Sequence, residues 1–402
     1  MKKFAATSIL SILLLTALSV YSRTQNPVPY ESEIESILKI EEHTLEIGFW
    51  DPQNFADIRQ SLPLSYDIPH GHLSLDHILF INDNLYNRSP FSYREKQAAA
   101  WIVEELLAMG YTWDNIQVQE FTIEETMFAE WGRGWSWLAS HPSVRRAELR
   151  RSTGLSQNVI LKVPGQSERL IIVGAHYDSY PFPGATDNAS GMALLLESAQ
   201  RMLYLDNYYT IKYVFFGAEE VGFNGAIYFV NELTEQEEYN IVFMINADTL
   251  FEGPYLIFGA GFDYSTAQGT APRHTEMRFY SPHSIPGLNE LTEQIETVAR
   301  ELSARHDFDL ISLPEAIFNS SDHLPFLRAG FTVVNLVSAY ITNNLNYRAF
   351  IARDGRRFAL PFSHSPRDDF HYIEENWPGL IETNMRAFSI FLEEMLMTQY
   401  RK

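Results

Sequence analysis

Three short apolar runs with strand character stand in the middle of the chain, and each is followed by histidine or acidic residues. The runs cover residues 170–173, 213–216 and 241–245, and a fourth run at 331–337 resembles them. Between the first two, residues 191–203 place apolar side chains at the spacing of one helix face. Strands that alternate with helices predict an α/β domain with a mostly parallel central sheet flanked by helices.

The polar residues that follow these runs are the candidate functional residues. Ligand-binding groups collect at the carboxyl ends of strands in open α/β sheets, so we expect these side chains to share one crevice. In chain order they are His176, Asp178, Asp187, Glu219, Glu220 and Asp248. So many carboxylates would repel one another without bound cations, because like charges at close range raise carboxylate pKa values. The pattern therefore predicts a site for more than one metal ion.

The available ligand types indicate zinc. The chain has no cysteine, which excludes disulfides, thiolate nucleophiles and Cys-ligated zinc. Imidazole combined with carboxylate is typical of catalytic zinc, although Mn²⁺ or Co²⁺ can bind similar ligands. Two metal ions need a shared ligand, and a carboxylate can bridge a separation of about 3.5–4 Å. Asp187, in a loop flanked by glycines, is the candidate for the bridge.

Taken singly, each acidic residue has a simpler interpretation. An Asp at a strand end is usually a helix cap or a turn residue, and Asp187 would be an acceptable N-cap for the helix that follows it. The pair Glu219 and Glu220 would suit a solvated turn. These interpretations explain poorly why all of the residues occur at consecutive strand ends, whereas a metal site explains it.

Six strings also resemble the motifs of the M28 family of metallopeptidases, in the order of that family. They are VGAHYDS (173–179), GATDNASG (184–191), FFGAEEVGFNGA (215–226), INADT (245–249), SSDHLPFLRAG (320–330) and HSPRDD (364–369). Six ordered matches are far more specific than any one of them. The resemblance implies a zinc-dependent exopeptidase (phosphorylase/hydrolase-like) architecture, an aminopeptidase activity and a peptide substrate.

The resemblance also implies a ligand set for two zinc ions. His176 and Asp248 would bind one ion, Glu220 and His364 would bind the other, and Asp187 would bridge them.

Further roles follow from the same resemblance. Glu219 would be the general base, and Asp178 would hydrogen-bond an imidazole and fix its tautomer. Asp322 and His323 would support the cleft without binding metal, and a capped turn before the next helix is the alternative for both.

The chain departs from the family pattern near the last histidine. Several relatives place a Tyr there to stabilise the oxyanion, whereas Phe362 and Ser363 precede His364 in this chain. Either Tyr340 or Tyr347 is a candidate for that role, and the alternative is that the metal ions suffice without a tyrosine. Glutaminyl cyclases, transferases on the same fold with one zinc, often have Trp where this chain has Ser363. The alternatives to an aminopeptidase are a cyclase, a carboxypeptidase or dipeptidase that uses the same site, and an inactive binding protein.

The N-terminus has the pattern of a cleavable signal peptide. Lys2 and Lys3 precede an apolar run at residues 9–20, which is short for a membrane span of roughly 20 residues. We predict a signal peptide at 1–22, an N-terminal extension at 23–77 and a catalytic domain at 78–402. The mature protein would be exported, to the periplasm or the medium, with no stable membrane span.

Other segments carry weaker predictions. Residues 93–109 have the periodicity of a helix that ends at Gly110, and insertions are expected near 126–151 and 253–287. Residues 69–77 contain three histidines, and with Pro and Gly beside them we expect an exposed loop there. The net charge of −21 excludes nucleic acid as a natural partner, because phosphate contacts need clustered Lys and Arg. The sequence does not predict an oligomeric state.

Overall fold

A computed structural model describes residue 62 and residues 64–123, 154–260, 288–312, 321–342, 348–351 and 357–400. All of them belong to one compact unit, Asp51–Lys402, of the two units into which the chain divides. The predicted signal peptide and the predicted insertion at 126–151 lie outside the described residues.

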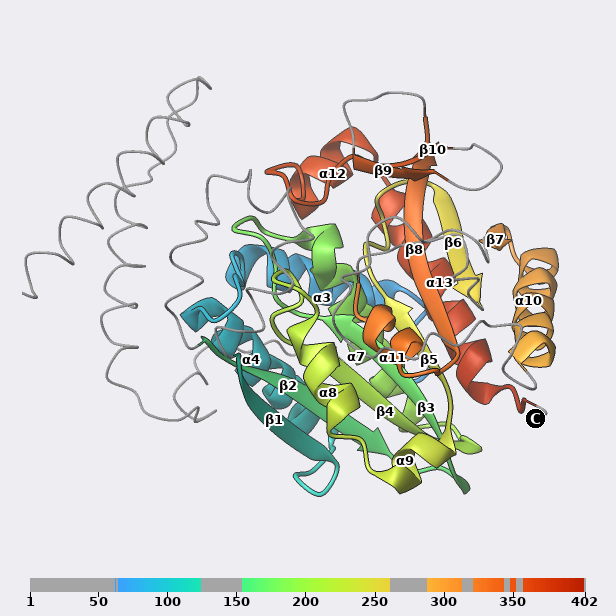
Figure 1. The fold of residues 1–402 in the computed structure, drawn as a ribbon. Coiled ribbons are helices and arrows are strands. Elements are labelled where there is room, and N and C mark those ends of the chain that lie inside the picture. Colours follow the sequence, from blue (N-terminus) through green and yellow to red (C-terminus); the bar gives the residue numbers. More distant parts are fainter. Residues whose placement is uncertain are drawn as a thin grey trace, which may run out of the picture. The chain divides into compact units, whose positions relative to one another are not determined.

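The centre of the sheet is parallel, as predicted. Strands β4 (Tyr209–Phe216), β3 (Ser167–His176), β5 (Ile241–Ala247) and β8 (Val333–Ile341) lie side by side in this order, each parallel to the next (Figure 1). These are the four apolar runs of the sequence. Their carboxyl ends therefore meet at one edge of the sheet.

The flanks of the ten-stranded sheet are largely antiparallel. Beyond β4 lie β2 (Gly154–Val163) and β1 (Ile116–Ile123), and beyond β8 lie β10 (Arg357–Leu360) and β9 (Arg348–Ile351). Two more strands leave this path: β6 (Tyr255–Ala260) pairs antiparallel with β8 and parallel with β7 (Leu310–Ser312). The segment 253–287, where we predicted an insertion, thus begins with a strand, and its residues 261–287 lie outside the described residues.

Helices cover both faces of the sheet (Figure 1). In that view α8 (Asn224–Asn231), α9 (Glu235–Asn240) and α11 (His323–Arg328) lie in front. Behind it lie α3 (His72–Asn84), α7 (Ser190–Met202) and α13 (Leu380–Met397). The remaining described α-helices are α4 (Tyr93–Met109), α10 (Leu288–Arg305) and α12 (Phe370–Asn376). None of the helices in the described ranges is long and apolar enough to cross a membrane.

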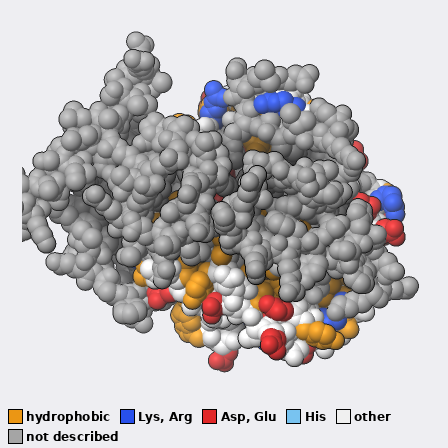
Figure 2. Space-filling view, in the orientation of Figure 1, with side chains coloured by type: hydrophobic (Ala, Val, Ile, Leu, Met, Phe, Trp, Pro, Cys, Tyr) orange, Lys and Arg blue, Asp and Glu red, His pale blue; other side chains and the backbone are white. Residues whose placement is uncertain are grey.

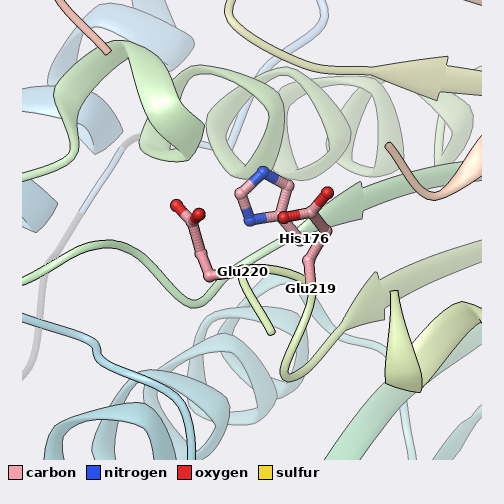
Figure 3. Close-up of side chains that lie close together, drawn as sticks. All are labelled: His176, Glu219 and Glu220. Atoms are coloured by element: carbon pink, nitrogen blue, oxygen red, sulfur yellow. The ribbon is translucent and has the colours of Figure 1, made fainter. Parts of the chain in front are cut away.

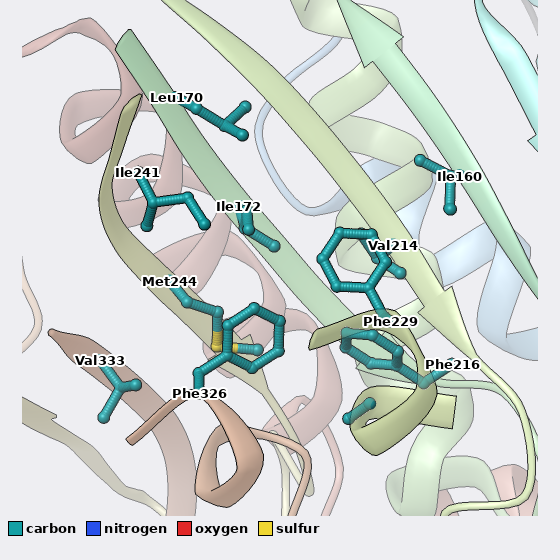
Figure 4. Packing of buried hydrophobic residues seen from close by; sticks show 11 residues of the cluster. Ile160, Leu170, Ile172, Val214, Phe216, Phe229, Ile241, Met244, Phe326 and Val333 are labelled. Atoms are coloured by element: carbon teal, nitrogen blue, oxygen red, sulfur yellow. The ribbon is translucent and has the colours of Figure 1, made fainter. Parts of the chain in front are cut away.

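A hydrophobic cluster joins the central strands to α8 and α11 (Figure 4). Ile172, Phe216 and Met244 from three neighbouring strands belong to this cluster together with Phe229 of α8 and Phe326 of α11, and all five are buried. Alternate strand residues point to opposite sheet faces, so a strand whose neighbours on both faces are helices is apolar along its length. This burial fixes the register of the strands and therefore the position of the polar residues at their ends.

Two local predictions have opposite outcomes. The helix at 93–109 is confirmed, with Ser92 accepting the Glu95 N–H at its start and Gly110 at φ 106° closing it. The exposed loop at 69–77 is wrong, because α3 begins at His72 and runs through residue 78, where we placed the start of the catalytic domain. His77 is fully buried, edge-on to Trp101, whereas His72 is exposed.

The start of α3 is stabilised by a residue far away in the sequence. Gly71 at its N-cap has no side chain to cap the helix, and Glu197 of α7 accepts the N–H groups of Gly71 and Ser74, each at 2.8 Å. The cap that local sequence lacks is thus supplied across the helix pair.

The described surface agrees with the acidic composition. Glu235 and Glu238 of α9 are exposed, and Figure 2 shows acidic side chains gathered at this place. Such a surface repels phosphate backbones.

Candidate metal centre

The structure brings together all six residues that we predicted as ligands and base. His176 ends β3, Glu219 and Glu220 follow β4, and Asp248 follows β5. The remaining two come from outside the strand ends: Asp187 from the helical turn η3 (Ala185–Ala189) and His364 from the segment between β10 and α12. Five of the six are buried, and His364 is intermediate.

Asp187 lies between the two histidines. Its Oδ1 is 3.3 Å from Nε2 of His176, which is also 3.6 Å from Oδ1 of Asp248. Its Oδ2 is 3.1 Å from Nε2 of His364, which is also 3.2 Å from Oε2 of Glu220. Two groups of three potential ligands therefore share one carboxylate, and the ligand atoms in each group lie within 4.8 Å of one another.

These distances suit zinc. Two tetrahedral ligands at about 2.1 Å from one ion lie about 3.4 Å apart. The four contacts of 3.1–3.6 Å between nitrogen and oxygen bracket that value. Oδ1 of Asp248 is buried without a hydrogen-bond partner, which is costly unless a cation binds it. The donor set, imidazole with carboxylate, also fits a catalytic zinc site.

Glu219 and Glu220 flank the imidazole of His176 in Figure 3, and the three form a further close group. Burial raises the pKa of Glu219 well above its usual range; His176 opposes the shift, while the carboxylates of Asp322 and Glu220 add to it. A Glu with a raised pKa is suited to accept and return a proton near neutral pH.

The pKa of Asp187 is shifted in the opposite direction to that of Glu219. Burial alone would raise its pKa, but the two histidines His176 and His364 hold the pKa well below the usual range. Asp187 is thus kept ionised, as a bridging ligand must be.

Asp178 organises two neighbouring strand ends. Its carboxylate accepts the backbone N–H groups of Glu219 and Glu220, each at 3.0 Å. Its backbone carbonyl lies 3.1 Å from Nδ1 of His176, whereas the carboxylate is 3.6 Å away. The imidazole contact that we predicted for Asp178 is thus made by its carbonyl oxygen. With Nδ1 donating there, Nε2 of His176 is the nitrogen left for a metal.

Asp322 differs from the capped turn that we considered. It occupies the N-cap position of α11 without a side-chain cap bond, and both carboxylate oxygens are buried without a hydrogen-bond partner. Burial raises its pKa well above the usual range; His176 opposes this, and Asp178 and Asp248 add to it. Neither Asp322 nor the buried His323 belongs to a group of potential ligands among the described residues.

Arg88 was missed by the sequence analysis. It is fully buried and donates to the backbone carbonyls of Leu85, Tyr177, Pro183 and Gly184 at 2.7–3.1 Å. These bonds hold the loop between His176 and Asp187. No periodic pattern marks an arginine in an irregular segment, so no signal for it exists in the sequence.

Glu95 of α4 was also missed. It accepts the N–H of Ala218, at 3.0 Å, and the hydroxyl of Ser156, at 2.7 Å. Ala218 has φ 53°, a left-handed conformation that is strained for residues other than glycine and recurs at functional sites. Glu95 thus stabilises the strained turn that presents Glu219.

Tyr180 stacks on the ring of His364 with a centroid distance of 3.8 Å. Of the tyrosines that we considered near this histidine, Tyr340 lies in β8 opposite Ala359 of β10, and Tyr347 lies outside the described residues.

Comparison with known proteins identifies the family. A family model described as peptidase family M28 matches residues 158–389, more than half of the chain. The chain belongs to peptidase family M28. Aminopeptidase YwaD of Bacillus subtilis is 31% identical over 225 residues, which cover 55% of this chain and 41% of that protein. A probable leucine aminopeptidase of Trichophyton verrucosum is 25% identical over 407 residues, which cover 91% and 93% of the two chains.

Some of these relatives are matched over only part of their length. The similarity covers 41%, 66% and 32% of YwaD, the Escherichia coli alkaline phosphatase isozyme conversion protein and a Pseudomonas aeruginosa aminopeptidase, respectively.

Solved structures confirm the predicted architecture. A zinc aminopeptidase from Bacillus subtilis superposes with a TM-score of 0.57 at 16% identity, covering 85% of this chain and 98% of its own. A glutaminyl cyclase from Bacteroides thetaiotaomicron superposes with a TM-score of 0.53 at 15% identity, covering 85% and 100%. At these identities the similarity concerns the fold alone.

Proposed function

We propose that this M28 protein is an aminopeptidase that uses two zinc ions to hydrolyse the N-terminal residue of peptides. One observation carries the proposal: the two carboxylate oxygens of Asp187 face two different histidines at 3.3 and 3.1 Å. Each histidine has a second carboxylate beside it, so the donor set divides into two halves around Asp187.

The residues that would hold the ions follow from this division. His176 and Asp248 would hold one ion, Glu220 and His364 the other, and Asp187 both. Bound zinc supplies a Lewis acid that polarises the peptide carbonyl and acidifies a water molecule. Mn²⁺ or Co²⁺ would suit the same ligands.

Glu219 would act as the general base that transfers a proton from the attacking water to the leaving amine. It lies beside the ligand Glu220 and His176, and its carboxylate is buried, so its pKa is raised. In the proposed reaction Glu219 takes the proton of the attacking water and delivers it to the leaving amine nitrogen when the peptide bond breaks. Asp178 holds the backbone of Glu219 during both transfers.

A glutaminyl cyclase is the second candidate. The observation that favours it is the fold similarity to solved glutaminyl cyclases, which is close to that for zinc aminopeptidases. A cyclase would bind one zinc ion and close N-terminal Gln without adding water.

One experiment separates these functions. The protein without residues 1–22 is assayed on a panel of aminoacyl anilides with and without a chelator, and on a peptide with N-terminal Gln monitored for cyclisation. We expect hydrolysis that the chelator abolishes and zinc restores, with two ions per chain by metal analysis. Cyclisation without hydrolysis, together with one ion, would establish the cyclase. No turnover of any substrate would establish a binding protein.

We further propose that the protein is exported after cleavage near Ser22, from the signal-peptide pattern of residues 1–22. Sequencing the N-terminus of the protein recovered from the periplasm or medium tests this. Retention of Met1 in the recovered protein would contradict it.

A further inference from the structure

Three buried carboxylates share one arrangement around the proposed metal centre. Each accepts the backbone N–H groups of two consecutive residues beside or including a proposed site residue. Asp178 accepts from Glu219 and Glu220, Asp368 from Thr186 and Asp187, and Glu252 from Phe362 and Ser363. None of these three carboxylates belongs to the groups of potential metal ligands among the described residues.

The three carboxylates connect different ligand-bearing segments. Asp178 follows His176 and holds the turn after β4. Glu252 follows Asp248 and holds the segment before His364, 110 residues further along the chain. Asp368 follows His364 and holds the turn of Asp187. The positions of Glu220, His364 and Asp187 therefore each depend on a carboxylate that lies close in the sequence to another proposed ligand.

Glu252 is the carboxylate on which His364 depends most directly. It is fully buried, and its Oε2 and Oε1 accept the Phe362 and Ser363 N–H groups at 2.8 and 2.6 Å. Burying a carboxylate costs free energy, and its hydrogen bonds offset that cost. Moving the two N–H donors away would lose this compensation, so the donors are held in place. The next residue, His364, has φ 57°, a strained conformation that persists only where its surroundings impose it.

The ring of His364 has support on a second side. Tyr180 stacks on it at 3.8 Å, and the imidazole Nε2 faces Asp187 and Glu220. Stacking restricts the tilt of the ring, but it does not fix where the backbone places it. The two peptide groups that Glu252 holds lie directly before His364 in the chain.

We propose that Glu252 is a positioning residue that fixes the two peptide groups before His364 and so sets how tightly His364, Asp187 and Glu220 bind their metal ion. The inference rests on the proposed function, because it assumes that these three residues hold a metal. Outer residues that orient ligands typically change metal affinity by about 10–100-fold when they are replaced.

The test measures metal affinity in the loaded protein. Wild type and Glu252→Gln are titrated with a chromophoric zinc chelator, and the release of each ion is followed. We expect one of the two ions to bind about 10–100-fold more weakly in the variant, while the other is retained as in wild type. Gln keeps the size of the side chain, but it offers one acceptor oxygen in place of two.

Glu197→Gln is the matched control. Glu197 is also fully buried and accepts two backbone N–H groups, from Gly71 and Ser74 at 2.8 Å, but it caps α3. We expect this variant to be less stable and to bind both ions as wild type does. Equal loss of the same ion in both variants would overturn the inference, because the effect would then be global.

Unchanged release of both ions from Glu252→Gln would also overturn it. Should that variant fail to fold, Glu252→Asp replaces it, since Asp keeps the charge but is too short to reach both amides; the same outcomes then apply. The wild-type stoichiometry reports separately on the proposed function. Fewer than two ions in wild type contradicts the two-zinc mechanism, whereas the difference between variant and wild type tests Glu252.

Discussion

Oδ2 of Asp187 lies 3.1 Å from Nε2 of His364, and this contact closes one half of the proposed metal centre. Oδ1 of Asp187 belongs to the half that contains His176 and lies 3.3 Å from Nε2 of that histidine. Asp187→Ala removes both contacts, so we expect the variant to bind at most one metal ion per chain. Metal analysis after dialysis measures this, and a crystal of the variant with two ions in place would refute the bridge.

Glu219→Gln separates proton transfer from metal binding. Gln has nearly the size of Glu but cannot accept a proton from water at neutral pH. Because Glu219 is not among the proposed ligands, both ions should remain, while kcat falls about 10²–10⁴-fold, the usual contribution of a general base. Metal content and kcat are measured on the same preparation. Full activity with both ions bound would exclude Glu219 as the base.

Arg88→Lys tests how much the buried guanidinium stabilises the loop before Asp187. Lys has three donors on one nitrogen and cannot reach the four separate carbonyls that Arg88 contacts. Each buried carbonyl left without a partner costs about 1–3 kcal/mol, so we expect the free energy of unfolding to fall by at least about 2 kcal/mol. Urea denaturation measures this.

Arg94→Lys is the control for that substitution. Arg94 is only partly buried; it bonds the side chain of Gln97 in its own helix and only one backbone carbonyl, that of Asn84 at 3.4 Å. A similar loss of stability in both variants would contradict the role given to Arg88.

The strand ends could be predicted because their determinants are local. Apolar runs mark the strands, and the sheet rule then places His176, Glu220 and Asp248 at one edge without further information. His364 follows no central strand, and only the resemblance to M28 motifs identified it. The rule and the motifs agree with the structure on which side chains meet.

Asp178 apart, the residues that hold the segments of the proposed ligands could not be predicted, because their contacts span large distances in the sequence. Glu252 bonds residues 110 positions away, and Glu197 caps a helix 126 positions away. A single Glu in an irregular segment has no periodicity, and its partners are backbone groups that every residue has. The prediction of a loop at 69–77 was wrong for the same reason, because the side chain that caps α3 belongs to another helix.

Asp322→Asn should stabilise the protein without metal. Asp322 has both carboxylate oxygens buried without hydrogen-bond partners, among other carboxylates that raise its pKa. Because an ionised carboxylate that is buried without hydrogen-bond partners is costly, a neutral amide should raise the free energy of unfolding at pH 8 with chelator present. Urea unfolding of both proteins measures this. Lower stability of the variant would show that Asp322 has a stabilising partner in solution.

His77 should make the stability of the protein depend on pH. Burial lowers its pKa to about 4, against 6.5 for the exposed group; Glu197 opposes the shift. The unfolded chain therefore takes up a proton below pH 6.5 that the folded protein takes up only near pH 4. The contribution of neutral His77 is complete above pH 6.5 and is lost as the pH falls to 4, up to roughly 3 kcal/mol.

His77→Gln removes this proton difference and keeps hydrogen-bonding capacity. The variant should lose less stability than wild type between pH 7.5 and pH 4.5, as measured by urea unfolding with a chelator present, so that metal release does not contribute. His72→Gln, on the same helix but exposed, is the control and should retain the wild-type pH dependence. If the free energy of unfolding depended on pH equally in wild type and His77→Gln, His77 would be protonated as readily in the folded protein as in the unfolded chain. Its burial beside Trp101 would then not control its protonation.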